Sequence, residues 1–222
     1  MFRMTLAALM LTSAVSAQTA PSTAEIAAYK GLFRAAHEGD VQGIGRLLDG
    51  GADIDARDSK GRAAIHVAAF ASHDDALRAL AEAGADMNAL EGRAYDVVTI
   101  AAVADDPELM SLAIDLGNDP GLVTSPYDGT ALIAAAHLGH VEVVRRLIAA
   151  GAPLDHVNNL HWTAVMEAVV LGDGGRDHQA VLAALLDAGA DRGLADRDGV
   201  TPLQHARARG YAEMAERLER AD

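Results

Sequence analysis

The chain has 222 residues, no cysteine, and 32 acidic against 18 basic residues, which gives a formal net charge of −14. The absence of cysteine excludes disulfides, thiolate nucleophiles and cysteine-bound zinc. The negative charge repels phosphates at long range, which argues against nucleic acid or anionic lipid as a partner and favours a neutral or basic protein.

Residues 1–17 have the pattern of a secretory signal peptide. Arg3 supplies the basic start, Met4 to Ala14 form a short apolar core, and Val15-Ser16-Ala17 form a small-residue cleavage site. Because this stretch is shorter than the roughly 20 apolar residues that span a bilayer, we expect it to be removed and not to anchor the chain. No asparagine of the mature chain starts an Asn-x-Ser/Thr glycosylation site, so we place the mature protein in a bacterial periplasm.

The first element of the mature chain is predicted to be a helix that begins at Ser22, because Ser22 and Glu25 match a capping box. We expect this helix to continue to about His37 and to close the N-terminal end of the fold.

Two markers then recur about every 33 residues and keep one register. Glycines that end a helix are spaced by 33, 33, 34 and 38 residues: Gly51, Gly84, Gly117, Gly151 and Gly189. Turns between paired helices recur at Gly39, Ser72, Asp105, Gly139, Gly172 and Gly210. A fixed period of this length indicates a stack of helix-turn-helix repeats, about six of them in residues 18–222, with the first and last acting as caps.

The fourth repeat shows the expected packing most clearly. In its first helix Leu132, Ala135 and Ala136 share one face, and in its second helix Val143, Val144, Leu147 and Ile148 repeat at helical spacing. At the C-terminal end, Met214 and Leu218 are expected to face inward, opposite the charged residues Glu213, Glu216, Arg217, Glu219 and Arg220.

The repeated text resembles the ankyrin family over nearly the whole mature chain. The fullest matches are Thr130-Ala131-Leu132 through Gly151-Ala152 and Asp198-Gly199-Val200-Thr201-Pro202-Leu203. The family's Thr-Pro-Leu-His signature is never complete. The resemblance implies an all-α solenoid of helix-turn-helix repeats joined by loops or short hairpins. It also implies that His66, at the family's structural histidine position, binds loop backbone.

Such stacks present loop tips and first helices as one concave surface, and the resemblance implies that partners bind there. The residues at these positions that we expect to contact a partner are Arg62, Phe70, Tyr95, Tyr127, His137, Leu160, Trp162, Val170 and Leu171. Aromatic and arginine side chains often dominate binding energy. The competing interpretation is that the three tip aromatics, Tyr95, Tyr127 and Trp162, only pack against adjacent loops.

The fifth repeat carries an insertion of five residues around Gly172 to His178, between its two helices. Lengthened loops of repeat arrays are frequent contact sites, and the glycines of this loop suggest flexibility. Asp173, Asp177 and His178 allow a metal hypothesis, but their spacing matches no metal motif, and a solvated turn is favoured.

The sequence predicts a non-catalytic, monomeric protein-interaction module without cofactor or metal. No serine lies in a Gly-x-Ser-x-Gly elbow, and no phosphate-cradling loop precedes a helix. His205 is interpreted as a helix-surface residue. Two specific versions are an immunity-like inhibitor of a basic secreted enzyme and, from resemblance to bacterial periplasmic ankyrin proteins, a supporter of a peroxide-defence enzyme such as a catalase. A hydrolytic or metal-dependent enzyme is the remaining alternative.

Overall fold

The computed structural model describes residues 20–220, so the predicted signal peptide at 1–17 lies outside the described residues. Residues 20–220 form 13 helices and one isolated bridge between Thr124 and Gly129, with no named strand. The expected all-α repeat solenoid is therefore confirmed. None of the described helices is long and apolar enough to cross a membrane.

The chain divides into two compact units. Unit 1 extends to Ala101 and includes Glu108–Asp119, and unit 2 contains Ala102–Pro107 and the residues from Pro120 onward. The helices of unit 1 are α2 (Thr23–Ala28), α3 (Gly31–Glu38), α4 (Val41–Asp49), α5 (Ala64–Phe70), α6 (Asp74–Glu82) and α8 (Pro107–Asp115), together with most of α7 (Val97–Ala104). Those of unit 2 are α9 (Ala131–Leu138), α10 (Val141–Ala149), α11 (Ala164–Val170), α12 (Arg176–Asp187), α13 (Pro202–Arg209) and α14 (Ala212–Glu219).

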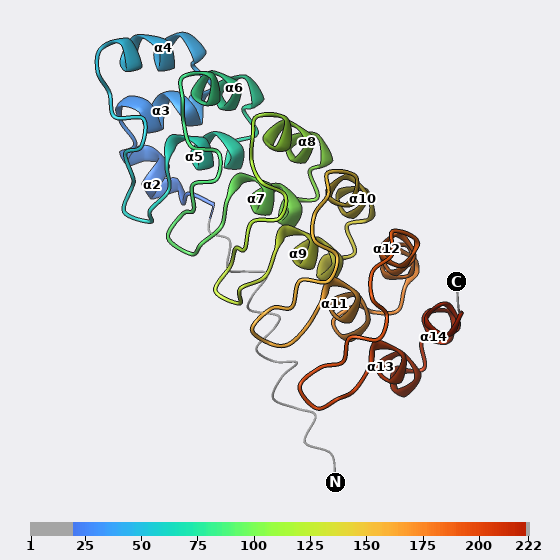
Figure 1. Ribbon diagram of the computed structural model, residues 1–222. Coiled ribbons are helices and arrows are strands. Elements are labelled where there is room, and N and C mark those ends of the chain that lie inside the picture. Colours follow the sequence, from blue (N-terminus) through green and yellow to red (C-terminus); the bar gives the residue numbers. More distant parts are fainter. Residues whose placement is uncertain (1–19, 221–222) are drawn as a thin grey trace. The chain divides into compact units, whose positions relative to one another are not determined.

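From α3 onward the helices form six consecutive pairs, each with a first and a second helix. Within unit 1, α3 packs on α5 and α4 packs on α6; within unit 2, α9, α11 and α13 form one row and α10, α12 and α14 the other (Figure 1). The first helices approach closely because they bury alanines: Ala36, Ala68, Ala135 and Ala168 are fully buried. Of the inward positions predicted in the fourth repeat, Leu132, Val143, Val144 and Leu147 are also fully buried, whereas Ile148 is half-buried.

Glycines end the second helices in the predicted way. Gly51 and Gly189 have φ angles of 83° and 95°, in the left-handed region that a side chain with a Cβ rarely adopts. The glycines that recur in the sequence therefore mark the ends of the second helices, as predicted.

The N-terminal helix differs from its prediction. The capping box of Ser22 and Glu25 is present, but α2 ends at Ala28 and a separate helix, α3, starts at Gly31. The break arises because Tyr29 adopts an extended conformation, with its hydroxyl donating to Asp58 Oδ2 at 2.9 Å, and because Gly31 has a φ of 53°. One predicted helix is thus two short ones.

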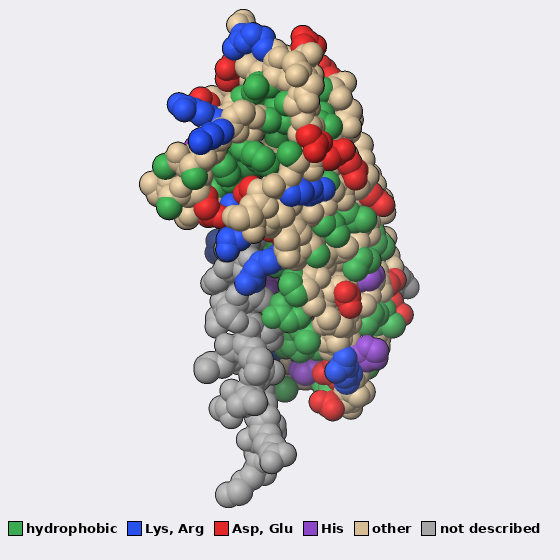
Figure 2. Space-filling view, turned by 90° about the vertical axis from the view of Figure 1, so that its left-hand side faces the viewer, with side chains coloured by type: hydrophobic (Ala, Val, Ile, Leu, Met, Phe, Trp, Pro, Cys, Tyr) green, Lys and Arg blue, Asp and Glu red, His purple; other side chains and the backbone are tan. Residues whose placement is uncertain are grey.

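The two ends of the array are finished differently. At the C-terminal end Met214 and Leu218 are buried and Glu213, Glu216 and Glu219 are exposed, as predicted. At the N-terminal end hydrophobic side chains gather in the upper part of the face drawn in Figure 2. On α4, Val41 is 40% exposed.

Ring side chains at the start of second helices bind the preceding repeat. The carbonyl oxygens at the end of a first helix lack partners within that helix. His140 Nδ1 lies 2.8 Å from the Ala102 oxygen, His178 Nε2 lies 2.9 Å from the His137 oxygen, and Tyr211 donates to the Gly172 oxygen at 3.1 Å. These bonds fix the spacing of consecutive repeats in unit 2.

In the third repeat, which lacks the Thr-Pro-Leu-His signature, buried polar side chains hold the start of the first helix. Asp96 accepts from Thr99 N–H at 2.8 Å and from Asn118 Nδ2 at 2.8 Å, while Asn118 Oδ1 accepts from Val98 N–H at 3.1 Å. Burial raises the pKa of Asp96, although these hydrogen bonds oppose the rise. The start of α7 is therefore fixed by a carboxylate and an amide.

Candidate functional site

Five loops that lead into first helices share one hydrogen-bonding pattern, and we call them the tip loops. In each, a polar side chain accepts from the backbone N–H groups two and four residues later, at 2.8–3.4 Å. The accepting residues are Asp58, Glu91, Ser125, Asn158 and Asp196. The residue three positions later always has a positive φ: Gly61, Ala94, Asp128, His161 and Gly199. The tips are therefore rigid turns in a common conformation.

The first tip loop of unit 1 contradicts the prediction that Arg62 faces a partner. The Arg62 side chain is fully buried; Nε donates to Asp58 Oδ2 at 2.7 Å and Nη2 donates to Glu25 Oε1 at 2.7 Å. Burial of Asp58 favours its neutral form, but hydrogen bonds from Arg62 and Lys60 outweigh it and lower the Asp58 pKa. Arg62 therefore holds α2 onto the repeat stack and is removed from the candidate surface.

Tyr95 is also buried, with 5% of its surface exposed. It lies in the second tip loop at the position equivalent to Arg62, where its N–H donates to Glu91. Its ring is therefore packed inside unit 1, in line with the competing interpretation that the tip aromatics pack within the protein. Phe70, the last residue of α5, is half-buried and stays available at the surface of unit 1.

Unit 2 brings together the other predicted residues on its tip loops and first helices. Tyr127 and Leu160 lie two positions after Ser125 and Asn158, and Trp162 lies four positions after Asn158. Val170 and Leu171 lie at the end of α11, and His137 lies at the end of α9. All six are partly exposed. We call them the unit 2 surface.

A buried polar chain supports this surface. Asn158 Nδ2 donates to Glu167 Oε1 at 3.0 Å, and Glu167 Oε2 lies 3.4 Å from His137 Nδ1. Glu167 is 3% exposed, so its carboxylate is satisfied by Asn158 and His137 inside the protein. The chain connects the Trp162 loop to two neighbouring first helices, α9 and α11.

Glu167 and Asn158 support the candidate site, and the sequence analysis did not identify them. The signal was present, since Glu167 is the single charged residue in the apolar helix α11. The equivalent position on α13 is His205, whose Nε2 lies 2.8 Å from Asp196 Oδ2. His205, predicted to be a helix-surface residue, is partly exposed, and it also binds the tip residue of its own repeat.

His66 confirms the role that the resemblance implied. Its Nδ1 accepts from Ala63 N–H at 3.0 Å and its Nε2 donates to the Ala89 oxygen at 2.9 Å, in the next loop. Burial lowers the pKa of His66 to about 4, so the ring is neutral at physiological pH.

The insertion of the fifth repeat is packed, contrary to the flexible loop expected. Its last residues, Arg176 to His178, begin α12, which has 12 residues against 9 in α10. Gly174 lies so close to the Tyr211 ring that a Cβ would come within 2.5 Å of it. His178 Nδ1 lies 3.0 Å from Asp173 Oδ1, and its other nitrogen is bound to the His137 oxygen. Within residues 20–220 no three His, Asp or Glu side chains group as a metal site.

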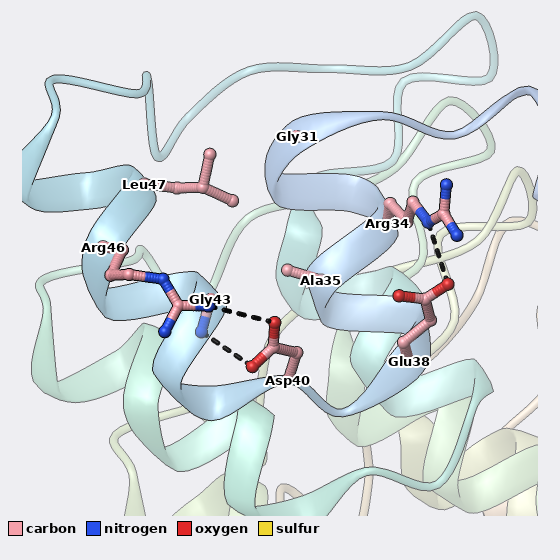
Figure 3. A pocket seen from close by; sticks show the side chains of 8 residues that line it. All are labelled: Gly31, Arg34, Ala35, Glu38, Asp40, Gly43, Arg46 and Leu47. Carbon is pink, nitrogen blue, oxygen red and sulfur yellow. Dashed lines mark hydrogen bonds and ion pairs between the residues drawn. The ribbon is translucent and has the colours of Figure 1, made fainter.

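A pocket of about 340 Å³ lies between α3 and α4 of unit 1 (Figure 3). Its charged groups already bind each other. Arg34 pairs with Glu38 at 2.8 Å, Arg46 lies 3.6 Å from Asp40, and Asp40 caps α4 through Gly43 N–H. The pocket contains none of the residues predicted to bind a partner.

Comparisons with known proteins agree with this geometry. A family model described as ankyrin repeats (3 copies) matches residues 12–91 and 98–196. The chain is 35% identical over 185 residues to the ankyrin repeat protein YahD of Escherichia coli (strain K12), which covers 83% of this chain and 92% of YahD.

Two solved structures show the same fold. An ankyrin repeat domain from Acinetobacter baumannii AYE, ABAYE2397, is 46% identical with a TM-score of 0.79, covering 84% of this chain and 95% of that one. A chain from the complex of the predatory endopeptidase Bd0816 of Bdellovibrio bacteriovorus with the immunity protein Bd3460 is 21% identical with a TM-score of 0.71, covering 87% and 99%. At that identity the likeness shows the fold alone.

Proposed function

Because this chain belongs to the ankyrin repeat family, whose repeats bind protein partners, we propose that it is a non-catalytic module that holds one protein partner on the unit 2 surface. The observation that carries this proposal is the position of Trp162, half-buried on a rigid tip loop that also carries Leu160 and whose Asn159 N–H donates to the Tyr127 oxygen of the preceding tip loop. Fold alone does not assign the function, so the argument rests on this surface.

Rigid presentation is what makes the surface suitable for binding. The backbone of Trp162 is held by Asn158, and Asn158 is in turn held by Glu167, so little conformational entropy is lost when a partner binds. Tryptophan and tyrosine bury large areas at low rotamer cost and commonly act as hot spots.

The partner that suits this chain is a neutral or basic protein. The net charge of −14 attracts basic proteins and repels nucleic acid, and it favours a monomer over self-association. We place the encounter in the bacterial periplasm, reached through the predicted signal peptide of residues 1–17.

Within this function, an immunity-like inhibitor of a basic secreted enzyme is the version that the charge supports. One structural neighbour comes from a complex of an endopeptidase with its immunity protein, which illustrates that this fold is compatible with such an assembly. Support of a peroxide-defence enzyme is the second version, and it rests on family resemblance.

The test is site-specific photo-crosslinking in the native compartment. A photoreactive residue at position 160 should capture one protein, and the same residue at the exposed position 41 in unit 1 should not. The affinity of the purified partner for Trp162→Ala should fall about 30-fold or more, the effect of losing a hot-spot side chain of about 2 kcal/mol. Val41→Ala is the matched control. Equal affinities for the two variants would remove Trp162 from the interface.

A further inference from the structure

The tip loops of unit 1 carry a local charge opposite to that of the whole chain. Three basic side chains, Arg57, Lys60 and Arg93, are exposed on or beside the first two tip loops. The carboxylates in the same loops, Asp58 and Glu91, point inward: the Asp58 side chain is 8% exposed and Glu91 is 7% exposed. An approaching molecule therefore meets cations at these two tips.

The turn geometry produces this arrangement. Each carboxylate accepts the backbone N–H of the basic residue two positions later: Lys60 donates to Asp58 and Arg93 donates to Glu91, both at 2.8 Å. The carboxylate is directed into the turn by these hydrogen bonds, and the basic side chain remains exposed. Arg62 adds nothing to this surface because it is buried with Glu25 and Asp58.

The two tips are held side by side. Gly92 N–H donates to the Lys60 oxygen at 2.9 Å, and Arg57 Nη1 donates to the Gly61 oxygen at 3.1 Å and to the Leu90 oxygen at 2.9 Å. Lys60 and Arg93 hold the same position in consecutive repeats, so their side chains leave the molecule from neighbouring, equivalent points. We call Arg57, Lys60 and Arg93 the unit 1 basic tips.

We propose that the unit 1 basic tips bind an acidic segment of a protein, a short run of Asp and Glu side chains. This site is separate from the unit 2 surface, and neither proposal needs the other. Three exposed cations on adjacent turns complement the charge of a few carboxylates along an extended peptide. The net charge of −14 does not prevent this contact, because salt screens charges beyond about 8 Å at physiological ionic strength. A long polyanion such as nucleic acid extends past the tips and meets the acidic remainder of the chain.

The test uses the full chain and a fluorescein-labelled hexaglutamate peptide, with hexaglutamine as the neutral reference, measured by fluorescence anisotropy at low and physiological ionic strength. Hexaglutamate should bind and hexaglutamine should not. Lys60→Gln combined with Arg93→Gln should weaken binding roughly tenfold, the sum of two exposed ion pairs. In wild type the amide NMR signals of Gly61 and Gly92 should shift on titration.

The matched control is Arg78→Gln combined with Arg176→Gln, which removes the same charge from two exposed arginines on α6 and α12. It should change the affinity by less than about twofold, since exposed charges away from the site act only through the screened net charge. Equal weakening in both double variants would show a nonspecific charge effect and overturn the proposal. Binding of a single-stranded oligonucleotide through the same tips, as tightly as hexaglutamate, would also overturn it and assign the site to nucleic acid.

Discussion

The first tip loop of unit 1 and the Trp162 loop of unit 2 have the same backbone and opposite uses. In both, a polar side chain accepts the N–H groups two and four residues later, and the fourth residue is Arg62 in one loop and Trp162 in the other. Arg62 is fully buried because α2 brings Glu25 to it, whereas Trp162 stays half-buried. One repeat position thus serves stability in one unit and is available for recognition in the other.

The helices that follow these two loops also differ between the units. The third helical residue is His66 in unit 1, bonded to the following loop, and the buried, apolar Met166 in unit 2. In unit 1 the exposed charged groups of the tips are cationic, and in unit 2 Tyr127, Leu160 and Trp162 lie in the corresponding loops. The two units therefore offer surfaces of different chemistry on one type of turn.

The largest expected effect comes from removing Arg62. Arg62→Ala leaves the carboxylates of Asp58 and Glu25 without their shared cation, and a buried pair that loses one partner costs about 3–5 kcal/mol. Urea unfolding followed by circular dichroism measures the loss. Arg78→Ala, at an exposed arginine, should stay within about 0.5 kcal/mol of wild type. A similar small change for both variants would mean that α2 contributes no stability.

His66→Ala is expected to cost about 2–4 kcal/mol, because it leaves the Ala63 N–H and the Ala89 carbonyl without partners and opens a cavity. The loss should depend on pH. The pKa of His66 is lowered to about 4 by burial, so below the unfolded value of 6.5 the unfolded chain binds a proton that the folded chain does not.

Wild type should therefore lose stability as pH falls from 6.5 to 4, by about 3 kcal/mol for this group alone. The His66→Ala variant should lack that part of the pH dependence, and the control His161→Asn, at an exposed histidine, should keep it. Parallel stability curves for wild type and His66→Ala over this range would contradict a neutral buried ring.

The sequence predicted features that depend on contacts within a repeat or with the next repeat, and it missed features that depend on contacts with residues outside the repeats. The glycine register located Gly51 and Gly189, and the position of His66 in the repeat gave its role, because both depend on contacts inside one repeat or with the next one. Arg62 and Tyr95 were placed on the surface wrongly. A register gives the position of a residue in the turn, but the burial of Arg62 depends on Glu25, which lies 37 residues earlier outside any repeat.

The insertion of the fifth repeat illustrates a second limit. Gly172 and Gly174 indicated flexibility in the sequence, yet they are small because His178 and Tyr211 pack against them. Composition does not distinguish a mobile glycine from one that makes room for a ring. The support of Trp162 was missed for a similar reason, since Asn158 and Glu167 meet only after folding.

Asn158→Ala would sharpen the comparison in unit 2. It removes the acceptor for Leu160 N–H and Trp162 N–H and the donor to Glu167, and we expect a loss of about 1–3 kcal/mol because these groups become unsatisfied. Asn158→Asp should restore the two backbone bonds but place a second carboxylate beside Glu167. Hydrogen exchange of the Trp162 amide measures the effect locally. Unchanged protection in Asn158→Ala would show that the loop is held by other contacts.

The smallest effect is expected for Glu25→Gln, and it should appear in acid. Hydrogen bonds from Ser22, and then the ion pair with Arg62, lower the pKa of Glu25 to about 2 from its usual value of 4.5. A lowered carboxylate pKa adds stability above the unfolded value, and this stability is lost as pH falls from 4.5 toward 2. The melting temperature of Glu25→Gln should therefore lie below that of wild type at neutral pH and converge with it toward pH 2.

Glu38→Gln, which removes an exposed carboxylate paired with Arg34 in the same unit, is the control. A constant difference between Glu25→Gln and wild type across the acid range would mean that Glu25 attaches α2 without its charge, and the contrast between Arg62 and Trp162 would then need another cause.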